Sequence, residues 1–140
     1  MDRLITFERI TIEPPLEAIY RRLGFRKGLT QIKPDEARTL GESIEKARSL
    51  ITLKGAARRL PISSKDSRQI RLPGSHCLES THLAKLLANS QEVLLMGATA
   101  GAAVIEAIRR DTAADNLTQA VVLDAAASEM VDAALDWMEA

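Results

Sequence analysis

The sequence predicts an α+β fold, in which a small mixed or antiparallel sheet packs with about five helices, the last of them long. Two observations lead to this fold class. Apolar residues recur at helical spacing in several segments, and short alternating or uncharged apolar runs between them indicate strands. The two kinds of segment do not alternate regularly, which argues against a parallel α/β sheet. The length of 140 residues is typical of one domain, so we expect a single domain over residues 1–140.

The first elements expected are a short strand and a short helix. Residues 7–12 alternate enough in polarity to indicate the strand, which ends before two prolines, Pro14 and Pro15. Proline is well tolerated at the first position of a helix, so the helix is expected to begin near Pro15 and to continue to Leu23. Gly24 then ends it, because glycine readily adopts the left-handed conformation that follows many helices.

The clearest helix follows Pro34, after a basic connector at residues 25–33. Its apolar residues recur at intervals of three and four, which places them on one face: Ala37, Leu40, Ile44, Ala47 and Ile51. Acidic residues in the first turn, Asp35 and Glu36, suit the positive end of the helix dipole. Gly55 is expected to close this helix.

The middle of the chain predicts strands and one short helix. Residues 56–62 and 68–72 are expected to form two short strands on either side of a polar turn at residues 63–67. Ser80 is a suitable N-terminal cap for a short helix, because its hydroxyl can accept a hydrogen bond from a free backbone N–H. The leucines of that helix are expected to face inward: Leu83, Leu86 and Leu87.

The last part of the chain predicts a strand and two helices. Residues 92–99 are expected to form a buried strand, because the run has no charged residue after Glu92. A helix is expected at about residues 102–110, and a long one at about residues 115–139. The apolar stripe expected on the long helix consists of Leu117, Val121, Ala125, Val131, Leu135 and Met138, with Ser128 on the same stripe.

Composition argues against several functional classes. Aromatic residues make up only 3% of the chain, which leaves few rings to stack on bases, so no nucleic-acid partner is expected. Cys77 is the only cysteine, so no internal disulfide can form and the chain is expected to be cytoplasmic. The sequence contains no recognisable signal peptide or membrane span, and no membrane partner is expected.

Charge is unevenly distributed, although the net charge is zero. Residues 1–72 contain 16 Lys and Arg against 9 Asp and Glu, a charge of +7, whereas residues 73–140 contain 3 against 10, a charge of −7. The two halves can neutralise one another by packing together, or the basic half can bind an acidic or phosphate-bearing partner. The candidate partner-binding residues of the basic half are Arg21, Arg22, Arg26 and Lys27.

Two further groups of residues are weak candidates for chemistry. The turn at residues 97–101 has two glycines followed by alanines, whereas a dinucleotide fingerprint needs three glycines and a P-loop needs a lysine, so a tight strand-to-helix turn is favoured. His76, Cys77 and His82 are the only soft metal-ligand candidates, and a loop and helix-start role is favoured over a zinc site or a Cys–His nucleophilic pair. The sequence therefore predicts no metal and no catalytic residue.

A family resemblance rests on four segments. They are Tyr20-Arg21-Arg22-Leu23-Gly24-Phe25, the helix from Pro34 to Ile51, the run from Leu83 through Thr99-Ala100-Gly101, and the segment from Ala120 to Glu129, which contains Leu123-Asp124-Ala125-Ala126-Ala127-Ser128-Glu129. In this order they resemble the Leu-Gly-aromatic helix end, the long second helix, the helix–strand–Thr-x-Gly unit and the Leu-Asp-Ala-x-x-Ser-Glu helix of small, stand-alone activation domains of cobalamin-dependent methionine synthase. The resemblance spans residues 7–138 and corresponds to the front part of that domain.

The resemblance implies a role in corrinoid chemistry. In the complete synthase, the activation domain binds S-adenosylmethionine and docks over the corrinoid-carrying domain. A flavodoxin-like reductant reduces inactive cob(II)alamin, and the methyl group of S-adenosylmethionine then traps the cobalt as methylcobalamin. By resemblance, the chain is expected to be an accessory domain of this methyltransferase activity in methionine biosynthesis, without catalytic activity of its own. Its partners would be a corrinoid-binding protein or other methionine synthase modules, which would carry the cobalamin, and a flavodoxin-like reductant.

The sequence departs from the family at the main S-adenosylmethionine motif, which is an arginine followed closely by Pro-Gly-Tyr. The family places this motif downstream of the long helix, and it does not occur in this chain. We therefore carry over no ligand-binding residue. The sequence leaves open whether the natural chain continues past Ala140 or is a short form that has lost cofactor binding. The alternative is that the chain is a non-catalytic module for protein interaction or oligomerisation. A homodimer would be one form of such an assembly.

Overall fold

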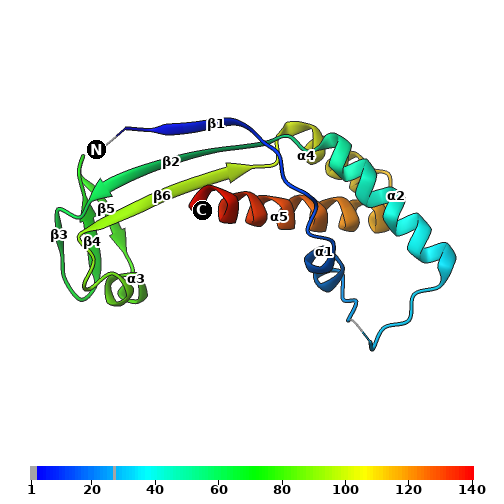
Figure 1. Cartoon of the computed structure of the whole chain (residues 1–140), viewed down its shortest axis with the longest axis horizontal. Helices are drawn as coiled ribbons and strands as arrows, with labels where there is room; N and C mark the ends of the chain where they lie inside the picture. Colours follow the sequence, from blue (N-terminus) through cyan, green and yellow to red (C-terminus); the bar gives the residue numbers. More distant parts are fainter. Residues whose placement is uncertain (1–2, 27) are drawn as a thin grey trace. The chain divides into compact units, whose positions relative to one another are not determined.

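The described residues, 3–26 and 28–140, contain five helices and six strands in the computed structural model (Figure 1). The helices are α1 (Leu16–Arg22), α2 (Pro34–Leu50), α3 (Thr81–Leu86), α4 (Ala102–Ala113) and α5 (Leu117–Glu139). The strands are β1 (Ile5–Ile10), β2 (Leu53–Pro61), β3 (Ser64–Lys65), β4 (Gln69–Leu72), β5 (His76–Glu79) and β6 (Glu92–Thr99). The predicted α+β class and the long C-terminal helix are confirmed.

The strands form two three-stranded antiparallel sheets, with the orders β1-β2-β6 and β3-β4-β5. In the second sheet, Ile70 of β4 pairs with Leu78 of β5. The prediction missed β3 and β5, because both are short and polar. The turn before β4 is held by Asp66, whose carboxylate accepts a hydrogen bond from the N–H of Arg68 at 2.7 Å.

The chain folds into two units, each with its own core. The strand unit consists of Ala56–Gly97 and the described residues up to Thr6, and the helical unit consists of Phe7–Gly55 and Ala98–Ala140. The strands β1, β2 and β6 have residues in both units. The single domain expected from the sequence stays a prediction, which unfolding measurements can test.

The core of the helical unit lies where α1, α2 and α4 pack against α5 (Figure 1). Six of its eleven buried residues are alanines, and such small side chains allow helices to approach closely. The eleven are Ile19, Ile44, Ala47, Ala100, Val104, Ala107, Val122, Leu123, Ala125, Ala126 and Ala127. A second cluster of this unit joins Ile10 and Leu53 to Met130 and Ala134 of α5.

The buried face of α5 differs from the predicted stripe. Leu117 and Val121 are 56% and 57% exposed, whereas Ala126 and Ala127 are buried. Because α5 is contacted by three helices, small residues rather than large ones fill much of its buried surface. A second correction concerns Gly55, which lies inside β2, since α2 already ends at Leu50. The predicted end of α1 is confirmed, because Gly24 has a φ of 94° there.

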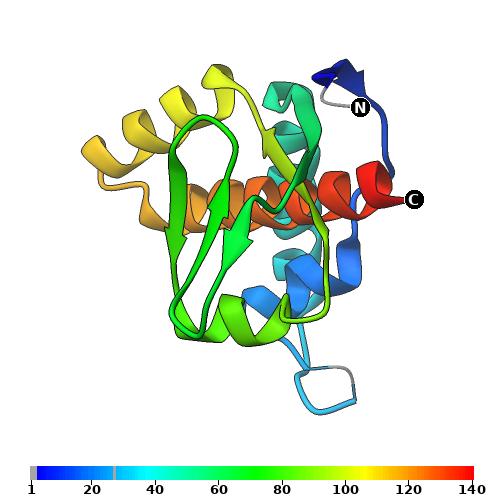
Figure 2. The same cartoon turned by 90° about the vertical axis from the view of Figure 1, so that its left-hand side faces the viewer.

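The core of the strand unit joins β4 and α3, which Figure 2 shows together with the neighbouring short strands. Its five buried residues are Leu60, Ile70, Leu72, Ala84 and Val93. Ser80 caps α3 as predicted, because its hydroxyl accepts a hydrogen bond from the N–H of Leu83 at 3.1 Å. The inward orientation predicted for Leu86 is wrong, since this residue is 69% exposed.

The predicted bounds of β6 are confirmed, but its predicted burial is wrong. Val93 is the only buried residue of the strand. Leu94 and Leu95 are 47% and 42% exposed. An uncharged apolar run therefore forms a strand that is largely open to solvent.

Candidate functional site

A cavity beside α1 is the main candidate site. Its volume is about 690 Å³, within the range of roughly 300–1,000 Å³ that is usual for ligand pockets. It is lined by Glu17, Tyr20, Arg21, Phe25, Arg26, Thr30 and Ile32, all of which belong to the helical unit. The cavity thus combines apolar and aromatic side chains with two guanidinium groups.

The end of α1 and the following loop shape this cavity. The positive φ of Gly24 turns the chain, and the N–H of Phe25 donates to the carbonyl of Tyr20 at 2.9 Å. The two rings meet edge to face with their centroids 6.1 Å apart. Arg26 and Thr30 then close the loop, because the N–H of Arg26 donates to the Thr30 hydroxyl and the N–H of Thr30 donates to the Arg26 carbonyl, both at 2.9 Å.

The predicted partner-binding residues separate into two groups. Arg21 and Arg26 line the cavity, whereas Arg22 contacts α5. Lys27 lies outside the described residues. Arg21 is 3.8 Å from Glu17 on the same helix, and both side chains are more than 70% exposed, so this ion pair holds Arg21 only weakly.

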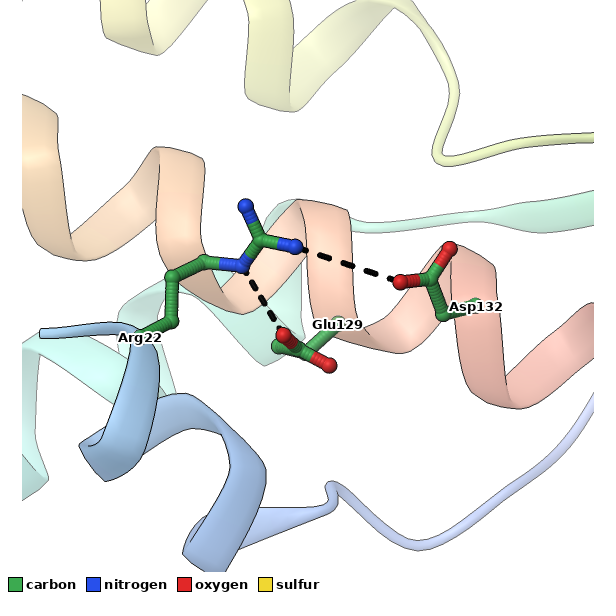
Figure 3. Close-up of polar contacts among 3 residues, drawn as sticks. All are labelled: Arg22, Glu129 and Asp132. Carbon is green, nitrogen blue, oxygen red and sulfur yellow. Dashed lines mark hydrogen bonds and ion pairs between the residues drawn. The ribbon is translucent and has the colours of Figure 1, made fainter.

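Arg22 lies beside two carboxylates of α5, as Figure 3 shows. Its Nε donates to Oε1 of Glu129 at 2.9 Å, and its Nη2 is 3.9 Å from Oδ2 of Asp132. The hydrogen bond to Glu129 and the negative charge of these carboxylates raise the pKa of Arg22 above its ordinary value. This contact joins the basic half of the sequence to the acidic half, so part of the charge asymmetry is neutralised within the molecule.

The glycine-containing turn between β6 and α4 allows the backbone at Gly101 to lie close to that of Thr52. Gly101 has a φ of 89°, and a Cβ there would lie 3.2 Å from the carbonyl oxygen of Thr52. Its N–H donates to the hydroxyl of Thr99 at 3.1 Å, so this amide is already paired within the turn. The geometry fits the tight strand-to-helix turn favoured by the sequence.

The other weak candidates do not assemble into a site. Cys77 is exposed on β5, and its thiol donates to Oε1 of Gln69 at 3.1 Å. Within residues 3–26 and 28–140, no group of three His, Cys, Asp or Glu side chains is placed to hold a metal ion. None of the helices in this part of the chain combines the length and apolar character needed to cross a membrane.

The two arginines of the cavity were predicted from the sequence, but its other lining residues were not. Tyr20 and Phe25 could have been recognised as candidate site residues from the sequence, because two of the four aromatic residues of the chain lie within six positions. Thr30 and Ile32 could not, since they reach the cavity only through the course of the loop. No protein-family model matches this chain, and no curated protein matches it significantly.

Proposed function

We propose that the chain is an accessory domain of corrinoid-dependent methyl transfer, which supports the reductive methylation of cob(II)alamin on a partner protein. The partner carries the cobalamin, and S-adenosylmethionine is the methyl donor. Docking on the partner protein is supported by the cavity beside α1, where the exposed side chains of Arg21 and Arg26 line the same cavity as the Tyr20–Phe25 pair. The family assignment rests on the four sequence segments described above.

The contact between α1 and α5 is in keeping with this family assignment. Two of the four resembling segments, the one that ends α1 and the one that contains Ser128-Glu129, meet through the hydrogen bond from Arg22 to Glu129. A third segment forms the turn at Gly101, where the Thr99 hydroxyl accepts the glycine N–H. Residues that carry the resemblance thus take part in the packing of the helical unit.

The charge of the cavity favours an anionic partner. Guanidinium groups bind phosphate and carboxylate oxygens through several parallel hydrogen bonds, and Arg21 and Arg26 are both exposed for such contacts. A corrinoid carries a phosphodiester in its tail, and a flavodoxin-like reductant has an acidic surface. Either feature of the corrinoid assembly suits this basic cavity.

The same cavity gives no clear place for S-adenosylmethionine. Its carboxylate suits a guanidinium group, but its ammonium and sulfonium cations would be repelled by Arg21 and Arg26. The single carboxylate of the cavity, that of Glu17, is already 3.8 Å from Arg21. We therefore assign no residue of this chain to the methyl donor.

Calorimetric titration against the corrinoid-carrying module of a cobalamin-dependent methionine synthase tests the proposal. The double variant Arg21→Glu/Arg26→Glu should bind at least about tenfold more weakly and lose most of the salt dependence of binding. The double variant Arg109→Glu/Arg110→Glu changes the charge equally at exposed positions of α4 and should bind like the wild type. No saturable binding by the wild-type chain would contradict the docking role.

Arg22 gives a sharper version of this test. Because its guanidinium is hydrogen-bonded to Glu129, Arg22→Gln should reduce the affinity for the corrinoid module much less than the change at Arg21 and Arg26. An equal loss would show that the docking surface extends beyond the cavity.

A second function is an interaction or oligomerisation module without cofactor binding. Exposed large apolar side chains favour it, namely Leu94, Leu95, Ile105, Leu117 and Val121. Self-association together with no affinity for the corrinoid module would select this function over the first.

A further inference from the structure

The strand β6 lies at one end of its sheet. The order β1-β2-β6 gives it a strand neighbour on one side, and no strand of residues 3–26 or 28–140 pairs with its other side. An edge of this kind presents backbone N–H and C=O groups that can pair with another chain. At eight residues, β6 is long enough to pair over much of its length.

The other edge strands have features that discourage pairing, whereas β6 does not. β1 contains Glu8 and Arg9, β3 has only two residues, and β5 has four and ends at Glu79. Charged residues and shortness are the usual means by which proteins block edge-to-edge association. β6 has no charge after its first residue, Glu92, and no proline.

Several side chains of this edge strand are exposed on the faces of the sheet. Leu94 and Leu95 are 47% and 42% exposed. Neighbouring residues of a strand point to opposite faces of the sheet, so the strand is open on both faces at this point. An added strand therefore gains apolar contacts on each face.

We propose that β6 pairs with the β6 strand of a second copy of this chain, antiparallel and about a two-fold axis at Leu95. In this register Leu95 faces its own counterpart, and Leu94 faces Met96 of the other copy. At the charged end of the strand, Glu92 faces the uncharged Ala98 of the other copy. No like charges therefore oppose one another, which favours a second copy as the occupant of the edge. The inference does not depend on the corrinoid role.

Sedimentation equilibrium gives the first test. The wild-type chain should have twice the monomer mass of 15.3 kDa at about 100 µM, where a micromolar interface is nearly saturated. Leu95→Lys and Leu95→Glu should each be monomeric, because like charges would meet at the two-fold axis. An equimolar mixture of the two variants should dimerise again, because opposite charges then face one another. Such a recovery also shows that both variants fold.

Leu86→Lys is the matched control for this experiment. Leu86 is 69% exposed in the same unit but lies on α3, so this variant should remain dimeric. A wild-type chain that stays monomeric would overturn the proposal. Dimers that persist in Leu95→Lys, or variants that do not recover on mixing, would overturn it as well.

Disulfide trapping tests the register. Facing residues of antiparallel strands have Cα atoms about 4.5–5.5 Å apart, which a disulfide can span. Leu95→Cys in a Cys77→Ser background should therefore form a covalent dimer under mild oxidation. Leu86→Cys in the same background should not, and equal crosslinking of the two variants would exclude the proposed register.

Discussion

The helical unit and the strand unit differ in the size and composition of their cores. The helical unit buries eleven residues in one cluster, six of them alanines, and four in a second cluster, one of them an alanine. The strand unit buries five residues in one cluster, four of them Leu, Ile or Val. Since hydrophobic stabilisation scales with the apolar area removed from water, the helical unit should be the more stable of the two. The difference indicates that closely packed helices can form a core from small side chains when enough residues contribute to it.

A single side chain reports on the helical unit alone. Trp137 is the only tryptophan, and its ring centroid lies 5.4 Å from that of Phe7 in an edge-to-face contact. Both residues belong to the helical unit. Tryptophan fluorescence therefore follows its unfolding, and amide hydrogen exchange at Ile70 follows that of the strand unit.

The largest effect is expected at the centre of the helical core. Leu123 has no exposed surface, so Leu123→Ala should lower the free energy of unfolding by about 3–5 kcal/mol, from lost burial and the cavity left behind. Urea denaturation followed by Trp137 fluorescence measures this. Leu117→Ala on the same helix, at a residue 56% exposed, should change stability by less than about 0.5 kcal/mol.

A change in the strand unit tests whether the two units are independent. Ile70 is fully buried, and Ile70→Ala should lower the stability of its own unit by about 2–4 kcal/mol, measured by hydrogen exchange. If the units unfold separately, the Trp137 transition will stay at the wild-type urea concentration. If that transition shifts with the mutation, the chain is one cooperative domain, as the sequence predicts, and the comparison between the units loses its thermodynamic meaning.

The smallest of these effects concerns the turn that leads into α4. Gly101→Ala should cost about 1–3 kcal/mol, because only glycine adopts this backbone conformation easily and the new Cβ would crowd the Thr52 carbonyl. Gly97→Ala, four residues earlier, has open space around the new Cβ and no positive φ, so it should be nearly neutral. Thermal unfolding followed by circular dichroism compares the two variants, and an equal loss would contradict this account of Gly101.

Features of the fold that depend on local chemistry could be predicted from the sequence. The start of α2 at Pro34, the Ser80 cap and the Gly24 helix end all follow from conformational preferences of single residues. The bounds of β6 follow from its uncharged run, which begins after Glu92 and ends before the turn at Gly101. These features do not require knowledge of what packs against the segment.

Features that depend on neighbours in space could not be predicted. The uncharged run of β6 was expected to be buried, but a strand at the end of a sheet lacks the neighbours that would cover it. The stripe predicted for α5 included Leu117 and Val121, which are exposed, and left out Ala126 and Ala127, which are buried. Likewise, Arg22 and Glu129 are 107 positions apart, and nothing in either local segment indicates their contact.

The helical unit is discontinuous, since Phe7–Gly55 and Ala98–Ala140 lie on either side of the segment Ala56–Gly97. A ribosome makes the chain from its N-terminus at about 5–20 residues per second. Synthesis of α5 is therefore completed several seconds after that of α1 and α2. During that interval, Ile19 and Ile44 lack the helix against which they are buried in the finished protein. The nascent chain therefore presents two apolar helix faces to chaperones before its first and last thirds can join.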